Sequence, residues 1–173
     1  MTRIGILSDT HGFVEPRLFD FFASCDMLFH AGDIGNMAAA DALSAFKPLV
    51  AVYGNIDGSD IRAAYPEVQR IDCEGIDILM THIGGYPARY DRKIYPVLKN
   101  HPPKLFIAGH SHILKVMYDK TLHFLHINPG AMGNSGIHRV KTAIRLVVDN
   151  DNMKDLEILE IPRTPNRSFS GED

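Results

Sequence analysis

Short apolar runs separated by polar breaks fill the first third of the chain. Residues 3–8, 27–30 and 48–52 form three such runs, and each predicts a buried strand. Between them, residues 16–23 and 36–45 place apolar side chains on one face of a helix, the second with Asn36 as its cap. This alternation of strands and helices is typical of a layered α/β fold.

After the third run the pattern changes mainly to strands. Residues 69–73 and 76–82, joined by Glu74-Gly75, predict a hairpin. Residues 87–100 predict a helix that kinks at Pro96, because proline lacks the N–H of a helical hydrogen bond. Further apolar runs predict five strands, over residues 104–108, 113–118, 122–128, 143–148 and 156–161.

Length and composition indicate a single domain. The 173 residues are enough to bury a sizeable core, and we expect one domain over residues 1–161 and a polar tail over 162–173. The net charge is −3 without a block of Lys or Arg, so the charge pattern carries no nucleic-acid footprint. No apolar stretch approaches the ~20 residues of a membrane helix, so no membrane partner is expected.

The cysteines and the N-terminal residues indicate the cellular compartment of the protein. Cys25 and Cys73 are isolated, which favours reduced thiols over a disulfide. The N-terminal sequence enters a strand pattern at once, so we expect no signal peptide and a cytoplasmic protein. A homo-oligomer is compatible with the sequence, because an apolar face can be core or interface.

Short polar clusters follow the predicted strands. They are Asp9-Thr10-His11, Gly32-Asp33, Gly54-Asn55-Ile56-Asp57, Thr81-His82 and Gly109-His110-Ser111-His112. In open α/β sheets, ligands bind beyond the carboxyl ends of the strands, so all the clusters can face one site. Together they supply seven candidate metal ligands: Asp9, His11, Asp33, Asn55, His82, His110 and His112.

This mixture of ligands points to a particular chemistry. Imidazole and oxygen donors suit Mn, Fe, Zn, Co or Ni better than Ca or Mg. Two divalent ions, two carboxylates and one bridging hydroxide would leave about one net positive charge, which attracts an anionic phosphate. Paired ions also lower the pKa of a shared water toward ~7, which supplies a hydroxide nucleophile.

The order D-x-H, G-D, G-N-x-D, lone His and G-H-x-H resembles that of the calcineurin-like metallophosphoesterases, above all their compact prokaryotic phosphodiesterase branch. The resemblance runs from Ile4 to about Gly133 and includes Asn128-Pro129-Gly130. It implies a four-layer αββα sandwich, in which two mixed β-sheets are flanked by helices. It also implies a small phosphoester as substrate and two transition-metal ions as cofactors, with Mn favoured.

The resemblance also implies a role for each ligand. Asp9, His11, Asp33 and His112 would hold one ion, and Asp33 would bridge to a second ion held by Asn55, His82 and His110. Asp33 and Asn55 would assist the attack of the metal-bridging hydroxide. Many relatives have a His after the motif Asn, where this chain has Ile56. Since a general acid contributes ~10²–10⁴-fold, its loss favours phosphodiesters with good leaving groups.

Several of these residue types also have ordinary structural roles. Alone, Asp9 and Asp33 would more often form turns or helix caps, and His82 would be an ordinary strand-end histidine. Asp57 is expected to anchor the Asn55 loop rather than bind metal. His30 is expected to pack or form hydrogen bonds. We assign His123 and His126 as structural or surface residues, and we expect His138 to contact the substrate from its glycine-rich loop.

The leading hypothesis is therefore a metal-dependent phosphodiesterase. Two alternatives stay open at this stage. One is a phosphomonoesterase of the same fold, in which His138 or another residue replaces the missing acid. The other is a metal-binding protein-interaction scaffold, a use to which the same fold is put in the retromer subunit.

Overall fold

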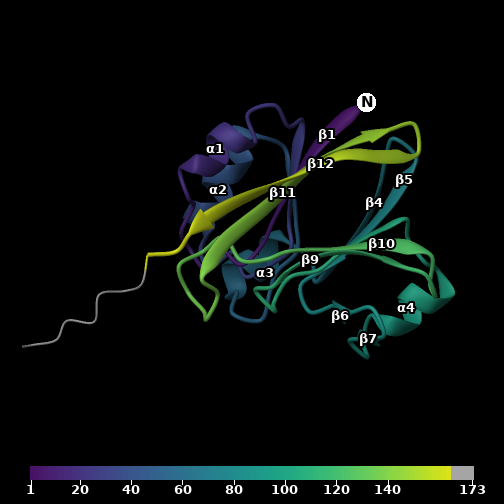
Figure 1. Cartoon of the computed structure of the whole chain (residues 1–173). Helices are drawn as coiled ribbons and strands as arrows, with labels where there is room; N and C mark the ends of the chain where they lie inside the picture. Colours follow the sequence, from purple (N-terminus) through teal and green to yellow (C-terminus); the bar gives the residue numbers. More distant parts are fainter. Residues whose placement is uncertain (165–173) are drawn as a thin grey trace, which may run out of the picture.

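The first of two facing sheets contains both the beginning and the end of the described chain. The computed structural model describes residues 1–164 (Figure 1). The strand order is β12-β11-β1-β2-β3, with bounds Asn152–Pro162, Val140–Asp149, Thr2–Leu7, Met27–His30 and Leu49–Ala51. Strands β1, β2 and β3 are parallel to one another, β11 is antiparallel to β1, and β12 is antiparallel to β11.

The second sheet has the same size and the same mixed character. Its order is β4-β5-β8-β10-β9, with bounds Val68–Cys73, Ile76–Thr81, Leu105–Ile107, Phe124–Pro129 and Leu114–Asp119. Strands β5, β8 and β10 are parallel, and the edge strands β4 and β9 are antiparallel to their neighbours. The predicted hairpin is therefore β4–β5.

The main core lies between the two sheets. Ile4 and Ile6 on β1 alternate with side chains on the opposite face, and they pack with Ile78 and Ile107 of the second sheet. The period of two in these strands places one apolar row inward, as expected for strands buried on both faces. The core thus fixes how the ends of β1 and β8 lie relative to each other.

Helices cover both outer faces, which completes the four expected layers (Figure 1). Helices α1 (Arg17–Phe21) and α2 (Met37–Phe46) pack Leu18 and Leu43 on the first sheet. On the second sheet, Leu98 of α4 (Tyr95–Asn100) packs against Phe106. Asn36 Oδ1 accepts the Ala39 N–H at 2.8 Å, so the predicted cap of α2 is confirmed. Among the described residues, no helix combines the length and apolarity needed to cross a bilayer.

The prediction of one long helix over residues 87–100 was wrong. Gly85–Tyr86 (β6) and Arg89–Tyr90 (β7) pair as a small hairpin, and only Tyr95–Asn100 is helical. Pro96 lies in the first turn of α4, where its missing N–H leaves no helical bond unmade, so it causes no kink. The apolar spacing in this segment reflects packing under the second sheet rather than one continuous helix.

Two further differences concern short or terminal elements. Helix α3 (Ser59–Ala64) was not predicted, because six residues with only Ile61 buried give too weak a periodic pattern. Strand β12 continues to Pro162, and Arg163 donates to the carbonyls of Gly136 and His138. Residues 165–173 of the expected tail lie outside the described residues.

Candidate metal centre

Five strands end at one edge of the sandwich, β1, β2 and β3 of the first sheet and β5 and β8 of the second, and one polar cluster follows each of them. Five candidate ligands there have left-handed backbone conformations: Asp9 (φ 55°), His11 (49°), Asp33 (54°), His110 (71°) and His112 (61°). This region is sparsely used by residues other than glycine, and such strain gathers at functional sites. Hydrogen bonds from Asp9 N to Gly32 O and from His11 N to Asp33 O, both 3.0 Å, hold the loops in place.

Asp9 is buried and uses its two carboxylate oxygens differently. Oδ2 accepts hydrogen bonds from Ser8 Oγ at 2.6 Å and from His110 N at 3.1 Å. Oδ1 has no hydrogen-bond partner, although it is also buried. Burial alone would raise the pKa of Asp9, but the neighbouring His11 and His112 outweigh it and lower that pKa strongly. The result is an ionised carboxylate with one oxygen reserved for a cation.

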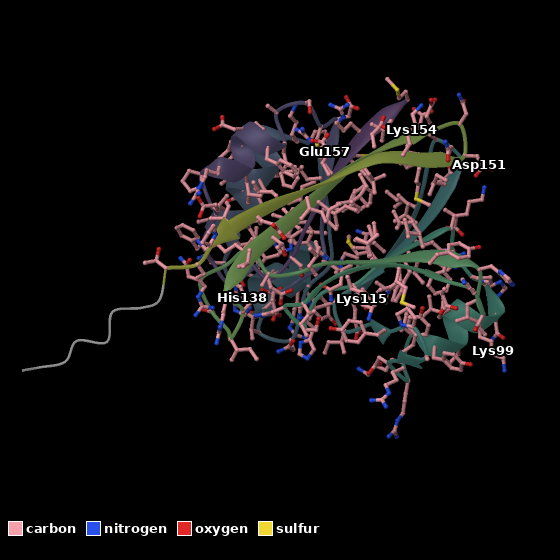
Figure 2. All side chains as sticks on the ribbon, in the orientation of Figure 1. Lys99, Lys115, His138, Asp151, Lys154 and Glu157 are labelled. Atoms are coloured by element: carbon pink, nitrogen blue, oxygen red, sulfur yellow. The ribbon has the colours of Figure 1, made fainter. Side chains whose placement is uncertain are left out.

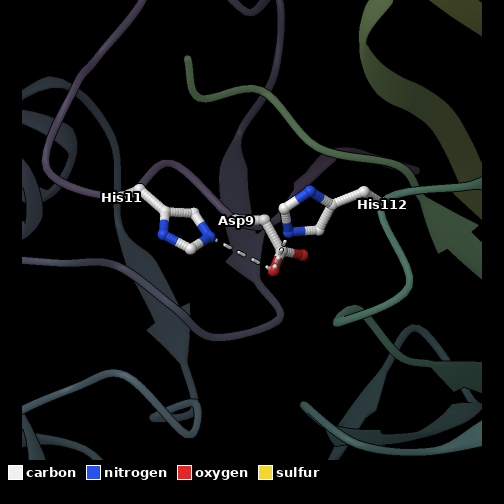
Figure 3. A group of neighbouring side chains, drawn as sticks. All are labelled: Asp9, His11 and His112. Carbon is white, nitrogen blue, oxygen red and sulfur yellow. Dashed lines mark ion pairs between the residues drawn. The ribbon is translucent and has the colours of Figure 1, made fainter. Parts of the chain in front are cut away.

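His11 and His112 flank that oxygen from two sides (Figure 3). His112 Nε2 lies 3.2 Å and His11 Nε2 3.8 Å from Asp9 Oδ1. Like Asp9 Oδ1, His11 Nε2 is buried without a hydrogen-bond partner. Unsatisfied buried polar atoms are rare in proteins, and two of them that converge with His112 Nε2 on one point indicate a position for a cation.

The second cluster consists of Asp33, His82 and His110. His82 Nδ1 lies 2.7 Å from the carbonyl of Ala31, which can only accept, so this nitrogen carries the proton. The remaining Nε2 faces Asp33 Oδ2 at 3.2 Å. Burial lowers the pKa of His82, but the Asp33 hydrogen bond and the charges of Asp9 and Asp33 raise it overall. Either a proton or a metal ion therefore belongs at Nε2.

Asp33 lies between the two clusters. Its Oδ1 accepts the backbone N–H of Ile56 at 3.0 Å. Its Oδ2 is 3.2 Å from His82 Nε2 and 3.7 Å from His11 Nε2. One oxygen of one carboxylate thus faces a ligand from each cluster, which is the arrangement that a bridging carboxylate requires.

Asn55 reaches the second cluster because of a glycine. Its Oδ1 lies 3.0 Å from His82 Nε2. A Cβ atom on Gly54 would lie 2.0 Å from Asp33 Oδ1, so any larger residue would push this loop away. Asp57 holds the loop by accepting the N–H groups of Gly54, Ile34 and Gly35, as expected from the sequence.

Arg62 also holds the Asn55 loop, and sequence reasoning missed it. Its guanidinium donates to the carbonyls of Asp57, Gly54 and Asn55, the first at 2.6 Å. It also lies over the ring of Tyr53, 4.4 Å from the centroid. Arg62 is on α3, a helix that the sequence pattern did not reveal, and no motif distinguishes this arginine from a surface residue.

The Asn128-Pro129-Gly130 turn positions the two histidines that follow Gly109. Asn128 Nδ2 donates to Gly109 O at 2.9 Å and to Ser111 Oγ at 3.1 Å. Gly130 N in turn donates to Asn128 Oδ1 at 3.0 Å, which fixes the orientation of the amide. This side chain therefore orders the loop that presents His110 and His112.

The other histidines are not part of these clusters. His30 is fully buried, accepts from Gly32 N and bonds to Thr10 Oγ1 at 2.9 Å, while burial lowers its pKa to about 4. His123 is exposed, and His126 is buried among Tyr86, Tyr90 and Phe106. His138 contacts His112, with both ring nitrogens directed at protein atoms.

A cavity of about 510 Å³ opens beside the second cluster. Asn55, His82, Ile83 and Lys93 are among the residues that line it. The structure thus brings all seven predicted ligands to one edge and places a cavity next to them. The donor atoms fit a pair of transition-metal ions, because imidazole nitrogens and carboxylate oxygens gather in two groups, and Asp33 of the second group also faces His11 of the first.

Comparisons with known proteins agree with this geometry. The model of the calcineurin-like phosphoesterase superfamily domain matches residues 2–151. A probable metallophosphoesterase of Methanocaldococcus jannaschii is 31% identical over 134 residues, which cover 74% of this chain and 67% of the relative.

Solved structures show the same fold. Vps29 from Entamoeba histolytica, in a complex with zinc, has a TM-score of 0.69 and 16% identity, covering 94% of this chain and 99% of that one. A structure described as a novel archaeal phosphodiesterase has a TM-score of 0.65 and 19% identity, covering 91% and 99%. With the family model matched over most of its length, this chain belongs to the calcineurin-like phosphoesterase superfamily.

Proposed function

We propose that this protein is a phosphodiesterase that acts with two divalent transition-metal ions, preferably Mn²⁺. The observation that carries the proposal is the position of Asp33 Oδ2, which faces His82 of one cluster and His11 of the other. A metallophosphoesterase family supplies the general chemistry. The diester preference comes from this chain's own residues.

Each cluster would hold one ion. Asp9, His11, Asp33 and His112 form the first set of ligands, and Asp33, Asn55, His82 and His110 form the second. When bound, such ions acidify water and neutralise charge on phosphate oxygens. With only two carboxylates among the ligands, the site keeps a net positive charge that favours an anionic phosphate.

Asn55 would orient the substrate as well as bind metal. Its Oδ1 is directed at His82, so its amide N–H groups are left to donate to a phosphate oxygen. The adjoining cavity, whose lining includes Ile83 and Lys93, would accommodate one ester group of a diester. Asp57 and Arg62 keep the Asn55 part of this lining in place through the backbone of the loop.

The residue after Asn55 sets the leaving-group requirement. Ile56 is about half exposed beside the site and offers no proton to a departing alkoxide. An acidic leaving group departs from a diester without being protonated, whereas the alkoxide of an alkyl monoester needs a proton to depart. The reaction would therefore favour aryl or similarly activated diesters.

The experiment is hydrolysis of bis-p-nitrophenyl phosphate against p-nitrophenyl phosphate, using metal-free protein reconstituted with Mn²⁺, Ni²⁺, Zn²⁺ or Mg²⁺. We expect metal-dependent turnover that favours the diester. Asp33→Asn should abolish it, while Asp41→Asn, the same chemical change at an exposed position, should not. Strong turnover of the monoester would contradict the diester preference. Metal binding without any hydrolysis would favour the scaffold alternative.

The cytoplasmic location is a proposal as well. Cys25 and Cys73 are both free and buried, and burial raises the pKa of the Cys25 thiol to about 11. Unreactive thiols without a disulfide suit a reducing compartment. Fractionation of cells followed by immunodetection would test it, and size-exclusion chromatography would test for a homo-oligomer.

A further inference from the structure

His138 lies outside both ligand clusters and yet contacts one of their members. It belongs to the glycine-rich loop between β10 and β11, and Figure 2 labels it beside the start of β11. Its Nδ1 is 3.2 Å from Nδ1 of His112, and the two rings meet edge to face with centroids 5.1 Å apart. Its Nε2 is 3.0 Å from the carbonyl oxygen of Gly133.

These two contacts fix where the protons are. A carbonyl oxygen only accepts hydrogen bonds, so His138 Nε2 must carry a proton and donate it to Gly133. Neutral His138 then has a lone pair on Nδ1. The bond to His112 can form in one direction only, with His112 Nδ1–H as the donor.

The consequence lies at the opposite side of the His112 ring. With its proton on Nδ1, His112 has an unprotonated Nε2, and this atom points at Asp9 Oδ1 from 3.2 Å (Figure 3). The opposite tautomer would place a proton where the cation belongs. We propose that His138 is a positioning residue that holds His112 in its metal-binding tautomer and orientation. This role rests on the metal site of the proposed function.

The loop is built around this pair of histidines. A Cβ atom on Gly136, which has φ +111°, would lie 2.3 Å from His112 Nδ1 and 3.2 Å from His138 Nδ1. Arg163 donates to the carbonyls of Gly136 and His138 at 2.6 and 3.1 Å. Gly133, whose carbonyl accepts from His138, also donates its N–H to Asp9 O at 2.9 Å. The same loop thus contacts the backbone of one ligand and the side chain of another.

This arrangement gives His138 a different role from the substrate contact expected from the sequence. Both ring nitrogens are engaged, one by Gly133 and one by His112. No N–H remains to donate to a phosphate oxygen or to a leaving group. Its effect on the reaction would pass through His112.

Metal binding and side-chain NMR would test the role without measuring hydrolysis. We would compare wild type, His138→Leu and His138→Gln by titration with Zn²⁺ and Co²⁺, because the amide of Gln can still accept from His112 and donate to Gly133. Partners of metal-binding histidines typically contribute 10–100-fold in metal affinity. His138→Leu should bind one of the two ions about 10–100-fold more weakly than wild type, and His138→Gln should restore most of that affinity.

The ring nitrogens of His112 provide the second readout. Two-bond ¹H–¹⁵N spectra of wild type should show a protonated Nδ1, and His138→Leu should show a mixture of tautomers. Gly136→Ala, which leaves His138 itself intact, should reproduce the weaker binding. Ile137→Ala, at the nearly fully exposed tip of the loop, should behave as wild type.

Three outcomes would overturn the proposal. The first is undiminished affinity in His138→Leu, with His112 still protonated at Nδ1. The second is an equal loss in His138→Leu and His138→Gln when thermal unfolding shows both to be folded. The third is a wild type that binds no ion, which would also overturn the proposed function. A wild type that binds two ions but hydrolyses no phosphodiester would refute the proposed reaction and leave the role of His138 to be decided by the binding and NMR data.

Discussion

His82 and Asn55 face each other through two atoms that both carry lone pairs. His82 Nε2 lies 3.0 Å from Asn55 Oδ1, while the proton of the ring is donated from Nδ1 to the carbonyl of Ala31. Two lone pairs at this distance repel unless a proton or a metal cation lies between them. This position therefore calls for a positive charge, supplied either by a proton on His82 Nε2 or by a bound metal ion.

Ion binding should accordingly raise the thermal stability of the protein. At about 100 times its Kd, an ion adds ~2.7 kcal/mol, which corresponds to roughly 5–10 °C in Tm for a domain of this size. Thermal unfolding followed by circular dichroism, with Mn²⁺ or with a chelator, would measure it. His82→Phe should lose most of the shift, and His101→Phe, at an exposed position, should keep it. An equal shift in His82→Phe would show that the ion binds elsewhere.

Gly54→Ala should damage the site through a single methyl group. The added carbon would lie 2.0 Å from Asp33 Oδ1, so the Asn55 loop must move away from the second cluster. We expect a loss of ~1–3 kcal/mol in the free energy of unfolding, as is typical of overpacking, together with weaker binding of one ion. Denaturant unfolding and metal titration would measure both.

Gly58→Ala is the matched control, because its added carbon would come no closer than 3.4 Å to Asp60 Oδ1. It lies on the same loop and carries the same substitution. If both variants bound metal like wild type, the close approach at Gly54 would have no functional meaning.

Ile56→His should extend the substrate range toward monoesters. A histidine there could protonate an alkoxide leaving group, which Ile56 cannot do. Since general acids contribute ~10²–10⁴-fold, kcat/KM for an alkyl phosphomonoester should rise by up to that factor relative to the aryl diester. Ile56→Gln, a polar residue without a titratable proton, is the control. A gain of the same size in Ile56→Gln would attribute the effect to polarity rather than to acid catalysis.

His126 should make the protein sensitive to mild acid. It is fully buried, neither ring nitrogen has a hydrogen-bond partner, and burial, helped by Lys115 and opposed by Asp119, lowers its pKa to about 4. Because this pKa is below the unfolded value, the unfolded state binds the proton first as the pH falls. The stabilising contribution is complete above about pH 6.5 and is lost progressively down to about pH 4.

The variant His126→Phe isolates this contribution. At pH 5 the free energy of unfolding of the wild type should be lower by about 2 kcal/mol because of His126, and that of the phenylalanine variant should not show this decrease. Urea unfolding from pH 8 to pH 4.5 would give both profiles. His30, whose pKa burial also lowers to about 4, acts equally in the two proteins and cancels from the difference. Parallel profiles would show that folding does not lower the pKa of His126.

Most of the architecture was predictable because strands buried on both faces leave a strong signal. The apolar runs that end at Ser8, His30 and Ala108 gave the correct parallel strands, and each was followed by part of the site. Residues 87–100 misled because Tyr90, Ile94 and Leu98 pack on one sheet face with helical spacing, although a hairpin precedes the helix. Periodicity indicates which side chains are buried. Here a continuous helix and the observed hairpin followed by a short helix would both bury Tyr90, Ile94 and Leu98.

The sequence identified the candidate ligands but not the network around them. The seven candidate ligands stand in short motifs that sequence patterns reveal, and the structure brings them to one edge. Arg62 acts by donating hydrogen bonds to backbone carbonyls, and Gly136 acts by leaving room for the ring of His112. Neither role can be recognised from the neighbouring sequence. The role of His138 depends on which proton its neighbour carries, and only the distances to Gly133 O and His112 Nδ1 define it.

The two sheets contribute different halves of the candidate centre. Asp9, His11, Asp33 and Asn55 follow strands of the first sheet, whereas His82, His110 and His112 follow strands of the second. Every distance between the halves is therefore set by how the sheets stack, far from the ligands themselves. Ile6 and Ile107, buried between the sheets, act as a spacer. A shorter side chain at either position would leave a cavity that the surrounding structure can close only in part, so the geometry of the candidate centre depends on the core as well as on the loops that carry it.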